Sequence, residues 1–308
     1  MRVIVTGAAG FLGGRVASML AADPRVSAVT GLDRASPPTG APFQGIVADI
    51  ARFTELAPMA DVVIHAAAIT SQVSEADPEL AFAINVEGMR AVLRWARMQA
   101  VPPRVLLLSS IAVFGRGDIV ATEDTQPEPR STYGTTKLIA ERLLLDATRR
   151  GEADGVILRL PVSIIRTATR TAPPGAGFVS DLIDAALRGR PFTAPLAPDH
   201  AIPVASVEAS LGLAMRAGLE AVPGRVLHVP SLAGSADSAR AALAACGIAT
   251  TGIACAPDPA VERLVAGWPA RLGTVYPGFS AGLVDPGLEP IILDHSTRIG
   301  VPLATAPA

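Results

Sequence analysis

The first fourteen residues constrain the fold more than any other segment of the chain. The apolar run Val3–Val5 leads into glycines at positions 7, 10 and 13, and an amphipathic pattern follows at once. This order predicts a buried strand, a tight turn and a helix. Gly7 can adopt backbone angles closed to other residues, and the later glycines leave room for a pyrophosphate at the helix start, whose free N–H groups bind phosphate. We therefore expect a dinucleotide phosphate site at Gly7, Gly10, Phe11, Leu12 and Gly13.

Strand and helix patterns alternate through the first half of the chain. Short apolar runs predict strands, and a longer amphipathic pattern predicts one helix over 78–98. Such alternation indicates a parallel sheet with helices on both faces. We therefore predict an α/β fold with a Rossmann-type doubly wound parallel sheet over residues 1–160. After the first strand, further strands are expected at 26–32, 43–47, 61–65, 105–108 and 156–160.

Residues at the carboxyl ends of the expected strands are candidates for cofactor contacts, because ligands of such sheets bind beyond those ends. Asp33 follows the glycines by about 20 residues, where a carboxylate accepts hydrogen bonds from the ribose hydroxyls and repels the 2′-phosphate of NADP. Arg34 is a residue type that NADP-binding proteins use, but Asp33 occupies the ribose position itself, so we expect NAD.

Four further residues are weaker candidates. Asp49 and Ile50 end the third strand beside the expected adenine, although loop aspartates are common. Ala67 lies in a run of small residues that lets a dinucleotide pass close to the backbone. Ser71 is a candidate for both cofactor and substrate contact, or equally a loop cap.

The reaction chemistry is expected at Tyr133 and Lys137. Residues four apart share one face of a helix. A tyrosine that acts as a base near neutral pH needs a pKa below its usual value of about 10, and an adjacent ammonium favours the phenolate. Lys137 is the only lysine among 26 Lys and Arg residues, which indicates a position where a compact point charge is needed. Ser110, at the end of the fifth strand, would hold the reacting oxygen in line.

The second half differs in character from the first. Prolines at 173, 174, 191, 195 and 198 break it into short pieces, with helical patterns at 178–187 and 206–217 and a further strand pattern at 226–229. We expect residues 161–308 to form a smaller C-terminal substrate-binding lobe that is interlaced with the first domain.

Composition excludes several classes of partner. A formal net charge of −2 with no basic run gives no surface for nucleic acid or an anionic membrane. No apolar run reaches membrane-spanning length, and the chain begins directly with a strand, so we expect no signal peptide. Cys246 and Cys255 lack metal or redox spacing and fit a reducing cytoplasm. The four histidines are scattered, so we expect no metal site.

These motifs together resemble the extended short-chain dehydrogenases/reductases, and the resemblance covers nearly the whole chain. It rests on the glycine spacing, Asp33, Ser110–Gly115, the Tyr133/Lys137 pair and Leu158–Pro161. It implies NAD as cofactor, a catalytic triad of Ser110, Tyr133 and Lys137, a cofactor contact at Pro161, and a homodimer built from the helices that carry Asn85 and Tyr133.

Within that family, other segments are similar to dehydrogenases of short sugar acids. They are Arg159–Val162, Arg166, Asp258–Arg263 and Ala266–Pro269. The similarity implies oxidation of a small hydroxy acid whose hydroxyl loses its proton to Tyr133. An arginine fork suits a carboxylate, so Arg166 is the candidate partner, although a surface or interdomain ion pair is an equal alternative.

Two other functions remain open at this point. A nucleotide-sugar epimerase or dehydratase would use the same triad with tightly held NAD, and the fold alone does not separate it from a dehydrogenase. A non-enzymatic NAD-sensing regulator is disfavoured, because a sensor has no need of an acid–base pair.

Overall fold

The computed structural model describes residues 1–117, 119–165 and 175–301, which form two compact units. The first unit comprises Met1–Val113, Pro127–Leu160 and Leu211–His228. The second takes Phe114–Gln126, Pro161–Ser210 and the chain after His228. The candidate Arg166 lies outside the described residues.

The first unit is built on a parallel sheet. In the described part of the chain this sheet has seven strands in the order β11-β7-β5-β4-β1-β2-β3, and every neighbouring pair is parallel. The strand order reverses direction at β1, so the carboxyl ends of β1 and β4 flank the position where such sheets bind ligands. The strands are β1 (Arg2–Thr6), β2 (Ala28–Asp33), β3 (Gln44–Val47), β4 (Val62–His65), β5 (Arg104–Ser110), β7 (Asp154–Leu160) and β11 (Val226–His228).

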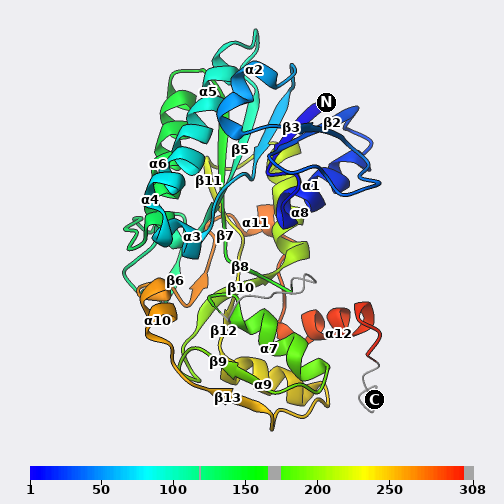
Figure 1. Cartoon of the computed structure of the whole chain (residues 1–308), viewed down its shortest axis with the longest axis vertical. Helices are drawn as coiled ribbons and strands as arrows, with labels where there is room; N and C mark the ends of the chain where they lie inside the picture. Colours follow the sequence, from blue (N-terminus) through cyan, green and yellow to red (C-terminus); the bar gives the residue numbers. More distant parts are fainter. Residues whose placement is uncertain (118, 166–174, 302–308) are drawn as a thin grey trace. The chain divides into compact units, whose positions relative to one another are not determined.

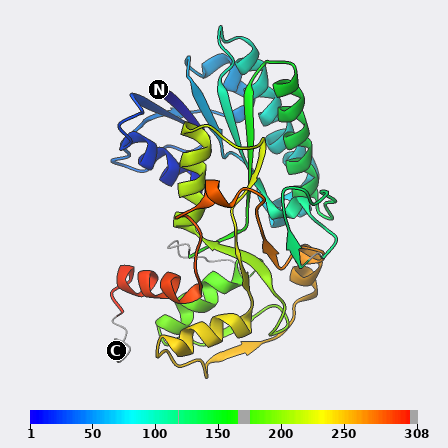
Figure 2. The same cartoon turned by 180° about the vertical axis from the view of Figure 1, so that it is seen from behind.

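Helices cover both faces of this sheet, which confirms the predicted doubly wound fold. α5 and α6 lie on one face, and α1 and α8 lie on the other (Figures 1 and 2). Val63, Val105 and Ile157 are fully buried beneath α5 and α6 in one apolar core, which explains the continuous apolar runs of these strands. The helices are α1 (Phe11–Ala21), α2 (Phe53–Leu56), α3 (Ser71–Ala76), α4 (Pro78–Ala81), α5 (Gly88–Arg97), α6 (Thr132–Arg149) and α8 (Val207–Leu219), with short 3-10 turns η1 (Ile50–Arg52) and η3 (Ile111–Val113).

Two elements differ from the sequence prediction. The helix expected over 78–98 contains a π-helical segment, η2 (Phe82–Glu87), between α4 and α5; a π turn adds one residue to the helical repeat, which a 3.6-residue pattern does not reveal. The strand expected at 226–229 is β11, and it pairs with β7 in the sheet of the first unit. That placement follows from α8, which precedes β11 and completes a parallel crossover.

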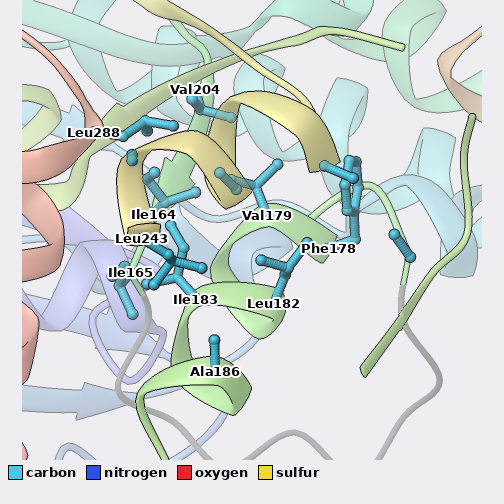
Figure 3. Close-up of a cluster of buried hydrophobic side chains, with 14 of the residues drawn as sticks. Ile164, Ile165, Phe178, Val179, Leu182, Ile183, Ala186, Val204, Leu243 and Leu288 are labelled. Carbon is cyan, nitrogen blue, oxygen red and sulfur yellow. The ribbon is translucent and has the colours of Figure 1, made fainter. Parts of the chain in front are cut away.

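The second unit has short strands around its own apolar core. β8 (Val162–Ile164), β10 (Ile202–Ser206) and β12 (Leu232–Gly234) form one sheet, while β9 (Phe192–Ala194) pairs with β13 (Ile253–Cys255) and β6 (Val120–Ala121) pairs with β14 (Arg271–Leu272). α7 (Phe178–Leu187) and α9 (Ala236–Ala245) pack together over this core (Figure 3). The remaining helices are α10 (Pro259–Val265), α11 (Pro277–Ser280) and α12 (Leu288–Arg298).

Candidate active site

The glycine turn after β1 is packed too tightly for a side chain at Gly7 or at Gly13. Gly7 has a φ of +71°, and a Cβ there would lie 2.8 Å from the backbone nitrogen of Ala67. A Cβ on Gly13 would lie 2.1 Å from the carbonyl oxygen of Gly7. Real Cβ atoms do not approach backbone so closely, so both positions require glycine. The start of α1 is thereby held against the ends of β1 and β4.

A pocket of about 220 Å³ opens beside this turn, entirely within the first unit. Gly7, Gly10, Asp33, Ile50 and Ala67 line it, and all five are cofactor residues expected from the sequence. The other lining residues are Leu32, Arg34, Ala48, Ala66, Ala68, Ile69, Leu80 and Ile84. A pocket lined by a glycine turn, one carboxylate and several apolar side chains suits a dinucleotide.

Asp33 is held in a fixed orientation in this pocket. One carboxylate oxygen accepts the backbone N–H of Ala9 (3.1 Å), and the other accepts that of Ala35 (3.0 Å). A carboxylate has about four acceptor positions, so Asp33 retains capacity for two ribose hydroxyls. Arg34 also lines the pocket and is exposed to solvent.

The remaining cofactor candidates have more local roles in the structure. Asp49 caps η1, because its carboxylate accepts the N–H of Ala51 (2.9 Å). Phe11 and Leu12 are the first residues of α1, and Ser71 is the first residue of α3. Pro161 lies in the second unit between β7 and β8. Their contacts with a cofactor remain predictions.

The helix that carries Tyr133 and Lys137 begins in direct contact with the segment after Ser110. Ser131 caps α6, with its hydroxyl oxygen accepting the N–H of Gly134 (3.0 Å). A Cβ on Gly134 would lie only 1.9 Å from the carbonyl oxygen of Ala112 in η3. Ala112 in turn donates its N–H to the hydroxyl of Ser110 (3.2 Å). The first turn of α6 and the end of β5 are therefore adjacent, which brings the elements of the expected triad together.

Lys137 is buried, with 2% of its surface exposed. Burial lowers the pKa of its ammonium to about 8, and the charge of Glu141, one turn further along α6, partly opposes that change. At neutral pH the charged form therefore still predominates. A buried cation on the same helix face as Tyr133 is the arrangement that favours a phenolate.

His65 is a hydrogen-bonded core residue, as expected from the sequence. Its Nδ1 lies 2.8 Å from the hydroxyl of Thr6, and 1% of the residue is exposed. Burial, followed by the charge of Lys137, lowers the pKa of the imidazole to about 3. His65 is therefore neutral across the physiological range and adds no charge to the site.

Several residues of this site were not identified as such in the sequence. Asn85, in the π segment, accepts the N–H of Ile69 (2.9 Å) and donates to the hydroxyl of Thr136 on α6 (3.0 Å). Gly134 allows the close packing described above, and Glu141 is a buried carboxylate. Of these residues, only Glu141 could have been recognised from the sequence, because it lies four residues after Lys137 on the same helix face.

The segment from Asp258 to Pro269 has structural roles in the second unit. Asp258 caps α10 by accepting the N–H of Ala260 (2.8 Å). Gly267 has a φ of +82°, and its carbonyl accepts the N–H of Gly117 (2.7 Å). A Cβ on Gly267 would lie 2.2 Å from the carbonyl oxygen of Gly115. This segment therefore fixes the loop that follows Phe114.

Among the described residues, none of the helices is both long and apolar enough to cross a membrane. Groups of three or more His, Cys, Asp or Glu that could hold a metal ion are likewise absent from the residues that the structure describes.

The chain is similar to a protein family, to a dehydrogenase of known activity and to several solved structures. The sequence profile of the NAD dependent epimerase/dehydratase family matches residues 3–197. D-erythronate dehydrogenase from Cupriavidus necator is 32% identical over 293 residues, which span 88% of this chain and 90% of that protein. The crystal structure of a nucleoside-diphosphate-sugar epimerase from Agrobacterium tumefaciens has a TM-score of 0.87 at 26% identity and covers 98% of this chain and 95% of that chain. The structure of MoeE5 in complex with UDP-glucose and NAD has a TM-score of 0.77 at 25% identity and covers 98% and 100%.

Proposed function

Because the chain belongs to the NAD-dependent epimerase/dehydratase family, we propose that it oxidises a short sugar acid, D-erythronate, to 2-dehydro-D-erythronate. The chain is an NAD-dependent oxidoreductase that acts on a CH–OH group. The proposal of D-erythronate as the substrate rests on the 32% identity to D-erythronate dehydrogenase along 88% of the chain, which includes both units.

The residues of the pocket fit NAD. The glycine turn leaves backbone surface where Cβ atoms would otherwise stand, and Asp33 keeps free acceptor positions. Bound NAD supplies a nicotinamide ring that accepts a hydride. Gly7, Gly10 and Gly13 would hold the pyrophosphate, Asp33 the adenosine ribose, and Ile50 and Ala67 the apolar walls.

The triad residues would move the proton. Tyr133 takes the proton of the substrate hydroxyl at its phenolic oxygen, Lys137 favours the phenolate by its charge, and Ser110 holds the substrate oxygen in line. For the acid itself, we propose contacts with Ser71, Ser110 and the guanidinium of Arg166. The hydroxyl next to the carboxylate is the proposed reacting group.

Steady-state kinetics test the substrate. We expect NADH formation with erythronate, weaker turnover with threonate and other short aldonates, and none with UDP-sugars. An Arg166→Met variant should have a raised KM for the acid, because a bidentate charged contact is lost. Arg170→Met, a change of the same kind four residues away, is the matched control. Turnover confined to UDP-sugars would contradict the substrate, and an unchanged KM in Arg166→Met would contradict the arginine role.

A nucleotide-sugar epimerase or dehydratase is the second candidate. The similarity to an Agrobacterium tumefaciens epimerase structure over 98% of the chain favours it. Such an enzyme returns the hydride and releases no NADH. The same kinetic screen separates the two, because product analysis of a UDP-sugar incubation would then show a changed sugar without NADH.

The cofactor preference provides a separate prediction about Asp33. We expect NAD to be favoured in the parent enzyme, and Asp33→Ala to reduce the ratio of NAD to NADP efficiency at least roughly fivefold, because a repulsion of about 1–4 kcal/mol is removed. Kinetics with both cofactors measure this ratio. Asp61→Ala serves as the control. Asp61 directly precedes β4, and its carboxylate accepts the N–H of Arg2. Equal efficiencies in the parent would show that Asp33 does not bind ribose.

We also propose a homodimer in the cytoplasm. A shallow apolar groove on the outer face of α6 supports the dimer, because Leu138, Ile139 and Leu143 line it between polar neighbours. A second copy of the chain would cover this face. Light scattering of the purified protein measures its molar mass and so tests whether it is a dimer. The free thiols of Cys246 and Cys255 fit a reducing compartment.

A further inference from the structure

A buried ion pair lies one helical turn beyond Lys137, and the proposed reaction makes no use of it. Glu141 accepts hydrogen bonds from Arg159 at both oxygens, from Nε to Oε1 (3.0 Å) and from Nη2 to Oε2 (2.7 Å). Ser109 donates a third, from Oγ to Oε1 (2.6 Å). The side chains of Glu141 and Arg159 are 2% and 4% exposed. Buried ion pairs are costly to desolvate and seldom add stability over apolar residues of similar volume, so a role beyond packing is indicated.

Glu141 is placed to act on Lys137. The two residues are four apart on α6 and both are buried, so they share one face of the helix and solvent screens their charges weakly. Arg159 and Ser109 fix the carboxylate from β7 and β5. Burial lowers the pKa of the Lys137 ammonium, and the charge of Glu141 opposes that change.

We propose that Glu141 is a positioning residue that keeps Lys137 in its charged form within the buried part of the site. Arg159 and Ser109 hold the Glu141 carboxylate in place for this task. The effect on turnover rests on the proposed function, whereas the effect on Lys137 itself does not.

Other ionisable groups around α6 do not supply this charge. His65 on β4 is neutral, because the pKa of its imidazole is lowered to about 3. Glu75 on α3 is exposed and accepts the N–H of Thr132 at the start of α6 (2.6 Å). Glu87 in η2 is exposed and pairs with Arg90 (2.8 Å). The remaining charged groups on elements packed against α6, each exposed or half-buried, are Glu79, Arg94, Arg97, Arg104 and Asp154.

The composition of the chain makes a direct measurement possible. Lys137 is the only lysine, so protein produced without a lysine-containing tag and labelled with ε-¹³C-lysine gives a single lysine signal by NMR. Its chemical shift reports the protonation of Lys137 in the cofactor-free, substrate-free protein. We expect a midpoint near pH 8 in the parent.

Two substitutions should move this midpoint in opposite directions. Glu141→Gln removes the negative charge that raises the pKa of Lys137, so the midpoint should fall by about one pH unit or more. Arg159→Gln leaves the carboxylate without its offsetting cation, so the midpoint should rise. If the Glu141–Arg159 pair had only a structural role, the two substitutions would not shift the Lys137 midpoint in opposite directions.

Asp154→Asn is the matched control. Its carboxylate also pairs with arginine, in this case with both Arg104 and Arg225, but it lies on β7 five residues from Arg159, roughly 16 Å along the strand. The Lys137 midpoint should be unchanged in this variant.

Circular dichroism checks that each variant is folded. If a single variant fails this check, the double variant Glu141→Gln/Arg159→Met replaces it, because that variant leaves no unpaired buried charge. The double variant should also lower the midpoint, because it too removes the charge of Glu141, which raises the pKa of Lys137.

The pH profile of turnover gives the second readout. Activity should be lost as pH rises through the Lys137 pKa, so the alkaline limb should move to lower pH in Glu141→Gln. An unchanged Lys137 midpoint in Glu141→Gln, or in the double variant where that is used, would overturn the inference. A shifted midpoint in a protein that oxidises no sugar acid would instead support the inference and refute the proposed function.

Discussion

Tyr133→Phe is expected to lower turnover by at least roughly 10²-fold while NAD binding is largely retained. The substitution removes only the phenolic oxygen, and a positioned general base typically contributes 10²–10⁴-fold to the rate. Tyr133 lies on the first turn of α6, whereas the lining residues of the cofactor pocket, among them Gly7 and Asp33, all come from other elements of the first unit. Steady-state rates and calorimetric titration with NAD measure the two effects separately.

The chain offers a close control for this variant. Tyr276 is the only other tyrosine and lies in the second unit, at the N-terminal cap of α11. Tyr276→Phe makes the same chemical change there and should retain the parent rate. Lys137→Arg should fail together with Tyr133→Phe, because a guanidinium is larger and planar and does not occupy the same buried space. A Tyr133→Phe enzyme with more than a tenth of the parent rate would remove Tyr133 from the proposed mechanism.

The parts of the site that the sequence predicted are those set by local rules. The positive φ of Gly7 and the close packing of Gly13 belong to a strand–turn–helix that adjacent residues encode. Asp33 and Ile50 follow because the carboxyl ends of parallel strands meet at one edge of a sheet. The membership of the extended dehydrogenase family, first inferred from these motifs, is confirmed by the family match over residues 3–197.

The parts that the sequence did not predict depend on contacts between distant segments. Leu80 and Ile84 line the cofactor pocket, but in the sequence they are only apolar positions of an amphipathic helix. Arg159 and Glu141 are eighteen residues apart and on different elements, so their pairing appears only when β7 packs against α6. The π segment shifts the register of its helix by a residue, and Asn85 there reaches both Ile69 and Thr136.

Gly134 shows how one such contact assembles the site. Replacing glycine with alanine normally favours a helix, by up to about 1 kcal/mol in its interior and less in its first turn, where Gly134 lies. Here the added Cβ would lie 1.9 Å from the carbonyl oxygen of Ala112 and 2.8 Å from its carbonyl carbon. Neither backbone atom can rotate away, so α6 must move relative to η3. Overpacking of this kind costs typically 1–3 kcal/mol and occasionally more, so the steric cost exceeds the gain in helix propensity.

Gly134→Ala is therefore expected to destabilise the protein and to reduce turnover sharply. A shift of about 1 Å in a reacting group costs roughly 10²-fold in rate, and any movement of α6 displaces Tyr133 from the end of β5. Thermal unfolding and steady-state kinetics measure the two losses. Gly278→Ala is the matched control, because Gly278 also lies in a helix, has no positive φ and would place its Cβ in open space. If Gly134→Ala unfolded at the parent temperature or above with an undiminished rate, the contact between α6 and η3 would not be what brings Tyr133 to Ser110.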